Sequence, residues 1–156
     1  MPVLDSEKKY AEELIVELPS RAYSLITAPL KNGTGAAVAI NDIVGWPVKL
    51  VGSDWEIAKA ADSNTVDGVV MKNANLKTTN TAGEPQRSVV NLASGATSTE
   101  QYLIVVRDAI LNLDAMPDKD AANANFDKTQ IATSLLACNP PILLAREPRI
   151  QYTQET

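Results

Sequence analysis

The sequence predicts a mainly β domain with one or two helices, an α+β fold whose body is a small β-barrel or sandwich. Three short runs between residues 45 and 70 are apolar or alternate apolar with polar residues, and tight polar corners separate them. Such runs are typical of β-strands. Residues 127–138 have the clearest helical spacing. Strands that do not alternate with helices argue against a doubly wound parallel sheet.

Length and composition fit one globular domain with its own core. The chain has 156 residues, of which 45% are hydrophobic and 21% are charged, and these proportions are typical of folded domains. Aromatic residues are only 4%, so the core must consist mainly of Val, Leu, Ile and Ala. We predict an N-terminal arm over residues 1–30 and a β-rich domain over residues 31–156.

The first part of the chain has two possible interpretations. Apolar residues recur at helical spacing from residue 6 to residue 18, but Leu14–Leu18 also suits a short strand. Pro19 ends either element, and residues 22–28 indicate an extended segment. The segment is then either an ordinary first element packed on the domain or an arm that packs against a partner, because chain termini are seldom ordered unless something holds them.

A series of strands forms the predicted body. We expect strands at residues 36–44, 48–51 and 55–59 and a further apolar run after Gly68. The polar segment 72–85 is long for a connection inside a compact domain, which predicts a binding loop or a partly mobile one.

The second half of the chain adds strands and the clearest helix. Strands are expected at residues 87–93, 101–111 and 142–145, and the pattern over residues 108–113 is ambiguous. The second strand contains an apolar run typical of a strand buried on both faces. Asp127 can cap the helix, with Gln130 three residues later as in a capping box. Ile131, Leu135 and Cys138 line one helical face, and Asn139-Pro140-Pro141 ends the helix.

Missing residue types exclude several chemistries. The chain has no histidine and one cysteine, which excludes Ser-His-Asp and Cys-His catalysis, histidine-bearing zinc sites and a disulfide within the chain. We expect Cys138 to be a small buried hydrophobic residue rather than a nucleophile. No enzyme activity, cofactor or metal is expected.

The remaining polar motifs have stronger structural than chemical interpretations. Gly33-Thr34-Gly35 lacks the Gly-Lys-Ser/Thr of a phosphate-binding loop, so a turn is favoured. Asp62, Asn64 and Asp67 lack the spacing of a calcium loop. An acidic cluster with interspersed lysines is more often a solvated, charge-balanced loop than a pair of catalytic carboxylates; its members are Asp114, Asp118, Asp120 and Asp127.

Charge and hydropathy limit the expected partners. The formal net charge is −5 and no basic stripe is present, so nucleic acid is not an expected partner. No apolar run approaches the ~20 residues that span a membrane, so no membrane partner is expected. The N-terminus has no signal-peptide pattern, which predicts synthesis in a cytoplasm. Trp46 and Trp55 flank the expected strand at residues 48–51 and suit sugar binding, although the core is expected to take at least one of them.

Three segments together resemble the capsid decoration (cement) proteins of tailed phages, the family of the lambda head decoration protein. They are the strands from Gly45 to Val70, the run from Tyr102 to Leu111, and the helix and strand from Phe126 to Glu147. The resemblance covers roughly residues 34–147. The Asn139-Pro140-Pro141 turn and the long N-terminal segment depart from the family pattern.

The resemblance implies a non-enzymatic virion protein on the capsid surface. It implies a homotrimer that binds the expanded head and bridges neighbouring subunits of the major capsid protein. In that case we expect residues 1–30 to face the capsid, with apolar anchors at Leu4, Tyr10, Leu14, Ile15 and Leu18. Residues of the polar segment are possible interface positions: Asn75, Lys77, Thr79 and Asn80. The alternatives are a virion fibre or host-surface module that binds carbohydrate through Trp46 and Trp55, and a small enzyme using carboxylates between Asp114 and Asp127.

Overall fold

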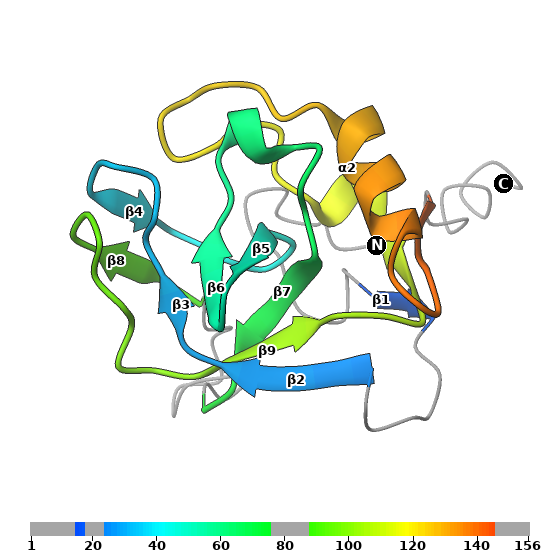
Figure 1. The fold of residues 1–156 in the computed structure, drawn as a ribbon, viewed down its shortest axis with the longest axis horizontal. Helices are drawn as coiled ribbons and strands as arrows, with labels where there is room; N and C mark the ends of the chain where they lie inside the picture. Colours follow the sequence, from blue (N-terminus) through cyan, green and yellow to red (C-terminus); the bar gives the residue numbers. More distant parts are fainter. Residues whose placement is uncertain (1–14, 18–23, 76–87, 146–156) are drawn as a thin grey trace, which may run out of the picture.

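The computed structural model describes residues 15–17, 24–75 and 88–145 (Figure 1). These residues form eleven β-strands, one α-helix and two short 3-10 turns, which confirms the predicted mainly β, α+β class. Within these ranges, no helix has the length and hydropathy needed to cross a membrane. The strands make three sheets of six, three and two strands.

The six-stranded sheet forms the centre of the fold. Its order across the sheet is β2 (Leu25–Ala28), β9 (Tyr102–Val105), β7 (Gly68–Asn73), β5 (Pro47–Val51), β6 (Asp54–Ile57) and β3 (Leu30–Lys31). All neighbours are antiparallel except β3 and β6, which are parallel. The two outermost strands, β2 and β3, are separated in sequence by Pro29 alone.

That connection forces the sheet to curl. Six strands laid flat would place the outermost strands about 24 Å apart, at about 4.8 Å per strand. Ala28 and Leu30 can be no more than about 7 Å apart, because two peptide units join them. The six-stranded sheet therefore bends until its two ends meet at Pro29, which gives the body a barrel-like form although the hydrogen-bonded sheet is open.

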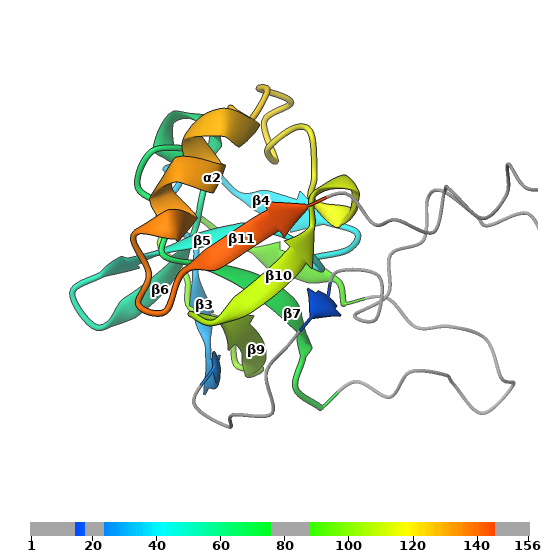
Figure 2. The ribbon, with the colours of Figure 1, turned by 90° about the vertical axis from the view of Figure 1, so that its right-hand side faces the viewer.

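Two smaller sheets complete the body. One contains β1 (Ile15–Glu17), β10 (Ala109–Asn112) and β11 (Ile142–Ala145), with β10 and β11 parallel. The other pairs β4 (Val38–Ile40) with β8 (Val90–Leu92) in antiparallel fashion. Figure 2 shows α2 (Lys128–Leu136) beside β11, with β10 next to it in the same sheet.

The prediction of one strand over residues 101–111 was wrong. The chain leaves the six-stranded sheet after Val105 and enters the three-stranded sheet at Ala109. Between them, Asp108 has a φ of 59°, which breaks the extended conformation. Its N–H donates to the carbonyl of Pro140 at 3.0 Å. A local backbone conformation thus divides an apolar run that looks continuous in the sequence.

The N-terminal region takes part in both larger sheets. Of the helix and the strand that the sequence allows here, the described residues Ile15–Glu17 form the strand, β1. β2 pairs along its whole length with β9, and the predicted boundary between residues 30 and 31 falls inside β3. Residues 24–30 therefore belong to the body. The other arm positions lie outside the described residues.

The helix forms as predicted. The Asp127 carboxylate accepts a hydrogen bond from the Gln130 N–H at 3.0 Å, which caps the N-terminus of α2. Ile131 and Leu135 are buried. Cys138, which was predicted to lie on the same helical face, comes after the last helical residue and is only partly buried.

The side chain of Asn32 joins two loops in the interior. Asn32 is 0% exposed. Its Nδ2 lies 2.7 Å from the carbonyl oxygen of Ala36, 3.2 Å from that of Leu92 and 3.1 Å from that of Ala93. Its Oδ1 accepts from both the N–H and the hydroxyl of Thr34, at 3.0 and 2.7 Å. Every polar atom of this amide is thus satisfied inside the protein.

The backbone around Asn32 also covers the outer edge of β3. The Asn32 N–H donates to Ala96, and the Asn32 carbonyl accepts from Gly95, both at 2.8 Å. The Ser98 N–H donates to the Leu30 carbonyl at 2.8 Å. Segment 95–98 therefore occupies the side of β3 that faces away from β6.

Two adjacent leucines in α2 provide a matched test of its packing. Leu135 is 0% exposed and Leu136 is 54% exposed. We predict that Leu135→Ala lowers the free energy of unfolding by about 2–5 kcal/mol, because it leaves a cavity in the core. Leu136→Ala should change it by no more than about 0.5 kcal/mol. Urea unfolding followed by circular dichroism measures both values, and equal losses in the two variants would contradict the assignment of the buried face.

Candidate functional site

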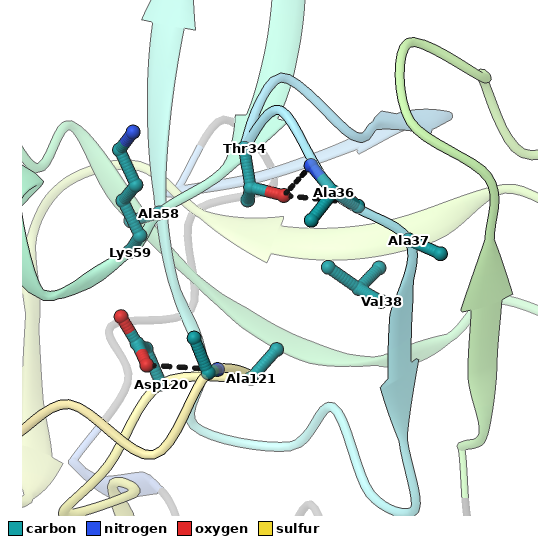
Figure 3. A pocket seen from close by; sticks show the side chains of 9 residues that line it. Thr34, Ala36, Ala37, Val38, Ala58, Lys59, Asp120 and Ala121 are labelled. Carbon is teal, nitrogen blue, oxygen red and sulfur yellow. Dashed lines mark hydrogen bonds between the residues drawn. The ribbon is translucent and has the colours of Figure 1, made fainter.

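A pocket of about 220 Å³ lies where three connecting segments meet (Figure 3). One wall comes from residues 34–38, the second from the end of β6 and the third from the connection that precedes α2. Most of the lining side chains are small and apolar. The lining residues are Thr34, Ala36, Ala37, Val38, Ala58, Lys59, Asp120, Ala121 and Ala122.

Hydrogen bonds hold the third wall of this pocket in place. Asp120 is 8% exposed. One of its carboxylate oxygens accepts from the Ala60 N–H at 2.8 Å, and the other accepts from the N–H groups of Ala122 and Ala124, both at 2.9 Å. These bonds tie the 120–124 turn to the segment that follows β6. The Asn32 amide holds the opposite wall through Thr34 and Ala36, so the pocket is preformed.

The chemistry available in the pocket is limited. Lys59 is exposed and contributes the one cationic group among the lining residues. Its ammonium points away from the Asp120 carboxylate (Figure 3). Asp120 uses both oxygens to accept backbone hydrogen bonds, and the Thr34 hydroxyl lies 2.7 Å from Asn32 Oδ1. The arrangement suits contact with a small apolar group better than proton transfer.

The predicted acidic cluster is dispersed in the fold. Asp118 forms an ion pair with Lys128 at 2.6 Å, and Asp127 caps α2. Asp118, Asp114 and Asp127 are exposed, as expected for a solvated loop, but Asp120 is buried. Three backbone amides offset the cost of removing the Asp120 charge from water, and the sequence pattern did not reveal this role.

The two carboxylates among the possible calcium ligands accept other hydrogen bonds. Asp62 accepts from the Lys49 ammonium at 2.9 Å and from the Lys59 N–H at 3.0 Å. Asp67 accepts from the Leu50 N–H at 2.8 Å. Within the part of the chain that the structure describes, no group of three or more His, Cys, Asp or Glu residues could hold a metal ion.

Cys138 lies in an environment that favours the protonated thiol. Its sulfur lies 3.7 Å from the Asp67 carbonyl oxygen. Burial raises the pKa of the Cys138 thiol, and the Asp67 carboxylate raises it further, while Arg107 acts in the opposite direction. The thiolate is the reactive form of cysteine, so this environment disfavours a nucleophilic role near neutral pH.

The tryptophans differ in accessibility. Trp46 is buried, its indole N–H donates to the Ala58 carbonyl at 3.2 Å, and its ring meets Phe126 edge to face with centroids 5.9 Å apart. This confirms that the core takes at least one tryptophan. Trp55 in β6 is partly buried against the core. The two rings therefore do not form a shared exposed surface for a sugar.

Few of the predicted interface residues lie in the described ranges. Ile15 is in β1, opposite Leu111 of β10. Asn75 is exposed, and its N–H donates to the Asn73 side chain at 3.0 Å. The remaining interface residues lie outside the described residues: Leu4, Tyr10, Leu14, Leu18, Lys77, Thr79 and Asn80.

The buried carboxylate of the pocket can be tested with a matched pair of variants. We predict that Asp120→Ala lowers the free energy of unfolding by about 1–3 kcal/mol, because three part-buried backbone N–H groups lose their acceptor. The exposed Asp114 serves as the control, and Asp114→Ala should cost no more than about 0.5 kcal/mol. Denaturant titration of both variants measures the difference. A neutral Asp120→Ala substitution would remove Asp120 as the group that holds the wall.

The environment of Cys138 predicts slow thiol chemistry. Iodoacetamide should alkylate the native protein more slowly near neutral pH than it alkylates the same chain in denaturant. Because the thiol pKa is raised in the fold, the native rate should continue to rise at pH values where the rate of the unfolded chain has levelled off. Mass spectrometry over time gives both rates, and a native rate at neutral pH above the denatured rate would refute the protonated-thiol assignment.

Comparisons with known proteins add no assignment to this geometry. No protein-family model matches the chain, and neither the curated proteins nor the solved structures contain a match.

Proposed function

We propose that this protein is a capsid decoration protein of a tailed phage. In this proposal it binds the expanded head as a trimer and bridges neighbouring subunits of the major capsid protein. It acts at the capsid surface after synthesis in the host cytoplasm, without catalysis and without a cofactor.

The observation that carries the proposal is that the first 30 residues supply edge strands to two different sheets. β1 lies at one end of the three-stranded sheet, and β2 lies at one end of the six-stranded sheet. An edge strand presents backbone N–H and carbonyl groups to which an extended segment of another chain can pair. The outer edge of β3 is covered by segment 95–98, whereas among the residues that the structure describes no strand pairs with the outer edge of β2.

Strand pairing suits a protein that must bind a repeating shell. Backbone hydrogen bonds supply contact with little demand on the sequence of the partner. A trimer would present three copies of each edge around its axis, and simultaneous attachment would raise the overall affinity well above that of one contact. This is the property that a clamp across neighbouring capsid subunits requires.

Exposed apolar side chains give further support for a protein partner. Leu50 and Val51 are 45% and 47% exposed beside the turn that joins β5 to β6. Leu143, in β11, is 43% exposed. Apolar surface of this kind contributes to association when a partner removes it from water.

Co-sedimentation with expanded, undecorated heads of the cognate phage tests the proposal. The wild-type chain should bind and saturate at a fixed ratio to the capsid protein. Thr27→Lys places a charge on the exposed face of β2 and should reduce this binding, because a lysine on an edge strand disfavours further pairing. Thr133→Lys, an exposed position in α2, is the matched control and should bind like the wild type.

A truncation distinguishes the contribution of the apolar anchors from that of the edge strands. Removal of residues 1–14 leaves β1 and β2 intact, and should weaken capsid binding if the apolar anchors before residue 15 contribute. Wild-type binding by both the truncated chain and Thr27→Lys would contradict attachment through the N-terminal region. A signal on a glycan array without any binding to heads would instead support the carbohydrate-binding alternative.

A further inference from the structure

Asn32 is the one asparagine in the chain that is followed by glycine. In this dipeptide the backbone nitrogen of the glycine can attack the side-chain amide carbon of the asparagine. Glycine permits the required backbone conformations because it has no side chain. We infer that Asn32–Gly33 is a self-modification site, which the native fold keeps inactive and which unfolding makes reactive.

The native structure opposes each requirement of the attack. The side chain must rotate toward the Gly33 nitrogen, but Oδ1 and Nδ2 are held by Thr34 on one side and by the carbonyls of Ala36, Leu92 and Ala93 on the other. Rotation would break all of these bonds inside the protein, where no water replaces them. Asn32 is also 0% exposed, so the water needed for the later hydrolysis has no access.

In the unfolded chain these restraints are absent. The Gly33 nitrogen forms a bond to the Asn32 side-chain carbon and loses its proton, while the side-chain amide leaves as ammonia. The resulting five-membered imide then reacts with water. Hydrolysis at one carbonyl gives aspartate, and hydrolysis at the other gives isoaspartate, in which the main chain runs through the side-chain carbon. No oxidant or reductant is involved.

Neither product can restore the native contacts. Aspartate at position 32 has no N–H group to donate to the carbonyls of Ala36, Leu92 and Ala93, and its charge would face these oxygens in a site without solvent. Isoaspartate lengthens the backbone beside β3, where Asn32 itself pairs with residues 95–96. Prolonged unfolding should therefore convert the chain into a form that does not refold.

Peptide mapping by mass spectrometry tests this inference on the full chain. The protein is kept in mildly alkaline buffer, once without denaturant and once unfolded in urea, and deamidation at position 32 is followed over time. The unfolded sample should deamidate at Asn32 many times faster than the native one. Exposed asparagines followed by other residues, such as Asn91 and Asn123, are internal controls and should be modified more slowly than Asn32 in the unfolded sample.

Refolding of the aged unfolded sample measures the consequence. After removal of urea and size-exclusion chromatography, the native peak should contain chains with intact Asn32, and modified chains should be depleted from it. Asn32→Asp, made directly, should fail to reach the native peak or should unfold at much lower urea concentration than the wild type. The aged Gly33→Ala chain should refold to the same extent as a freshly unfolded Gly33→Ala sample, since its deamidation is slowed. The fresh sample accounts for any effect of the added methyl group, which would contact the Glu56 side chain.

Three results would overturn the inference. They are equal deamidation rates at Asn32 in the native and unfolded samples, recovery of modified chains in the native peak in proportion to their abundance, and wild-type stability of Asn32→Asp. The first would show that the hydrogen bonds do not protect the site. The other two would show that the fold does not need the amide.

Discussion

The buried side-chain amide of Asn32 joins the end of the curled sheet to the two loops beside it. The six-stranded sheet must bend because Pro29 alone separates its two outermost strands, and Asn32 follows directly after the second of them. With five side-chain contacts and two backbone hydrogen bonds, this residue fixes both the 34–36 loop and the 92–96 segment. The pocket wall and the covered edge of β3 both depend on it.

The same constraint makes the two ends of the large sheet different. Segment 95–98 covers β3, whereas β2 has β9 as its one strand neighbour within the described part of the chain. An edge that can accept another strand is a hazard for aggregation unless a partner or a blocking residue occupies it. Attachment to a repeating shell is one way in which such an edge becomes useful, and this connects the fold to the proposed function.

Local sequence patterns predicted the elements better than their assembly. The Asp127 cap and the apolar spacing of α2 are local features, as are the alternating hairpin strands β5 and β6, and all of these were found near the predicted positions. The switch between sheets at Asp108 was missed because a continuous apolar run gives no signal of a residue with positive φ. The pairing of β1 with β10 and that of β2 with β9 were missed, because strand partners that are distant in sequence give no local signal.

The same limit applies to the candidate site. The sequence pattern places Asp120 among four acidic residues of a solvated loop, but its role depends on Ala60, which is brought beside it by the tertiary fold. Asn32, which precedes the predicted turn at Gly33-Thr34-Gly35, gives no local signal of burial, because its partners at residues 92 and 93 are about sixty positions away in sequence. Residue type alone did not distinguish these two buried polar groups from exposed ones.

A cryo-electron microscopy reconstruction of expanded heads incubated with this protein tests the central claim most directly. The proposal requires trimeric density at positions where capsid subunits meet, with an extended segment of a neighbouring chain running beside β2 or β1. Density in which the protein binds with both edge strands facing solvent, or heads that carry no added density at saturating protein, would contradict it.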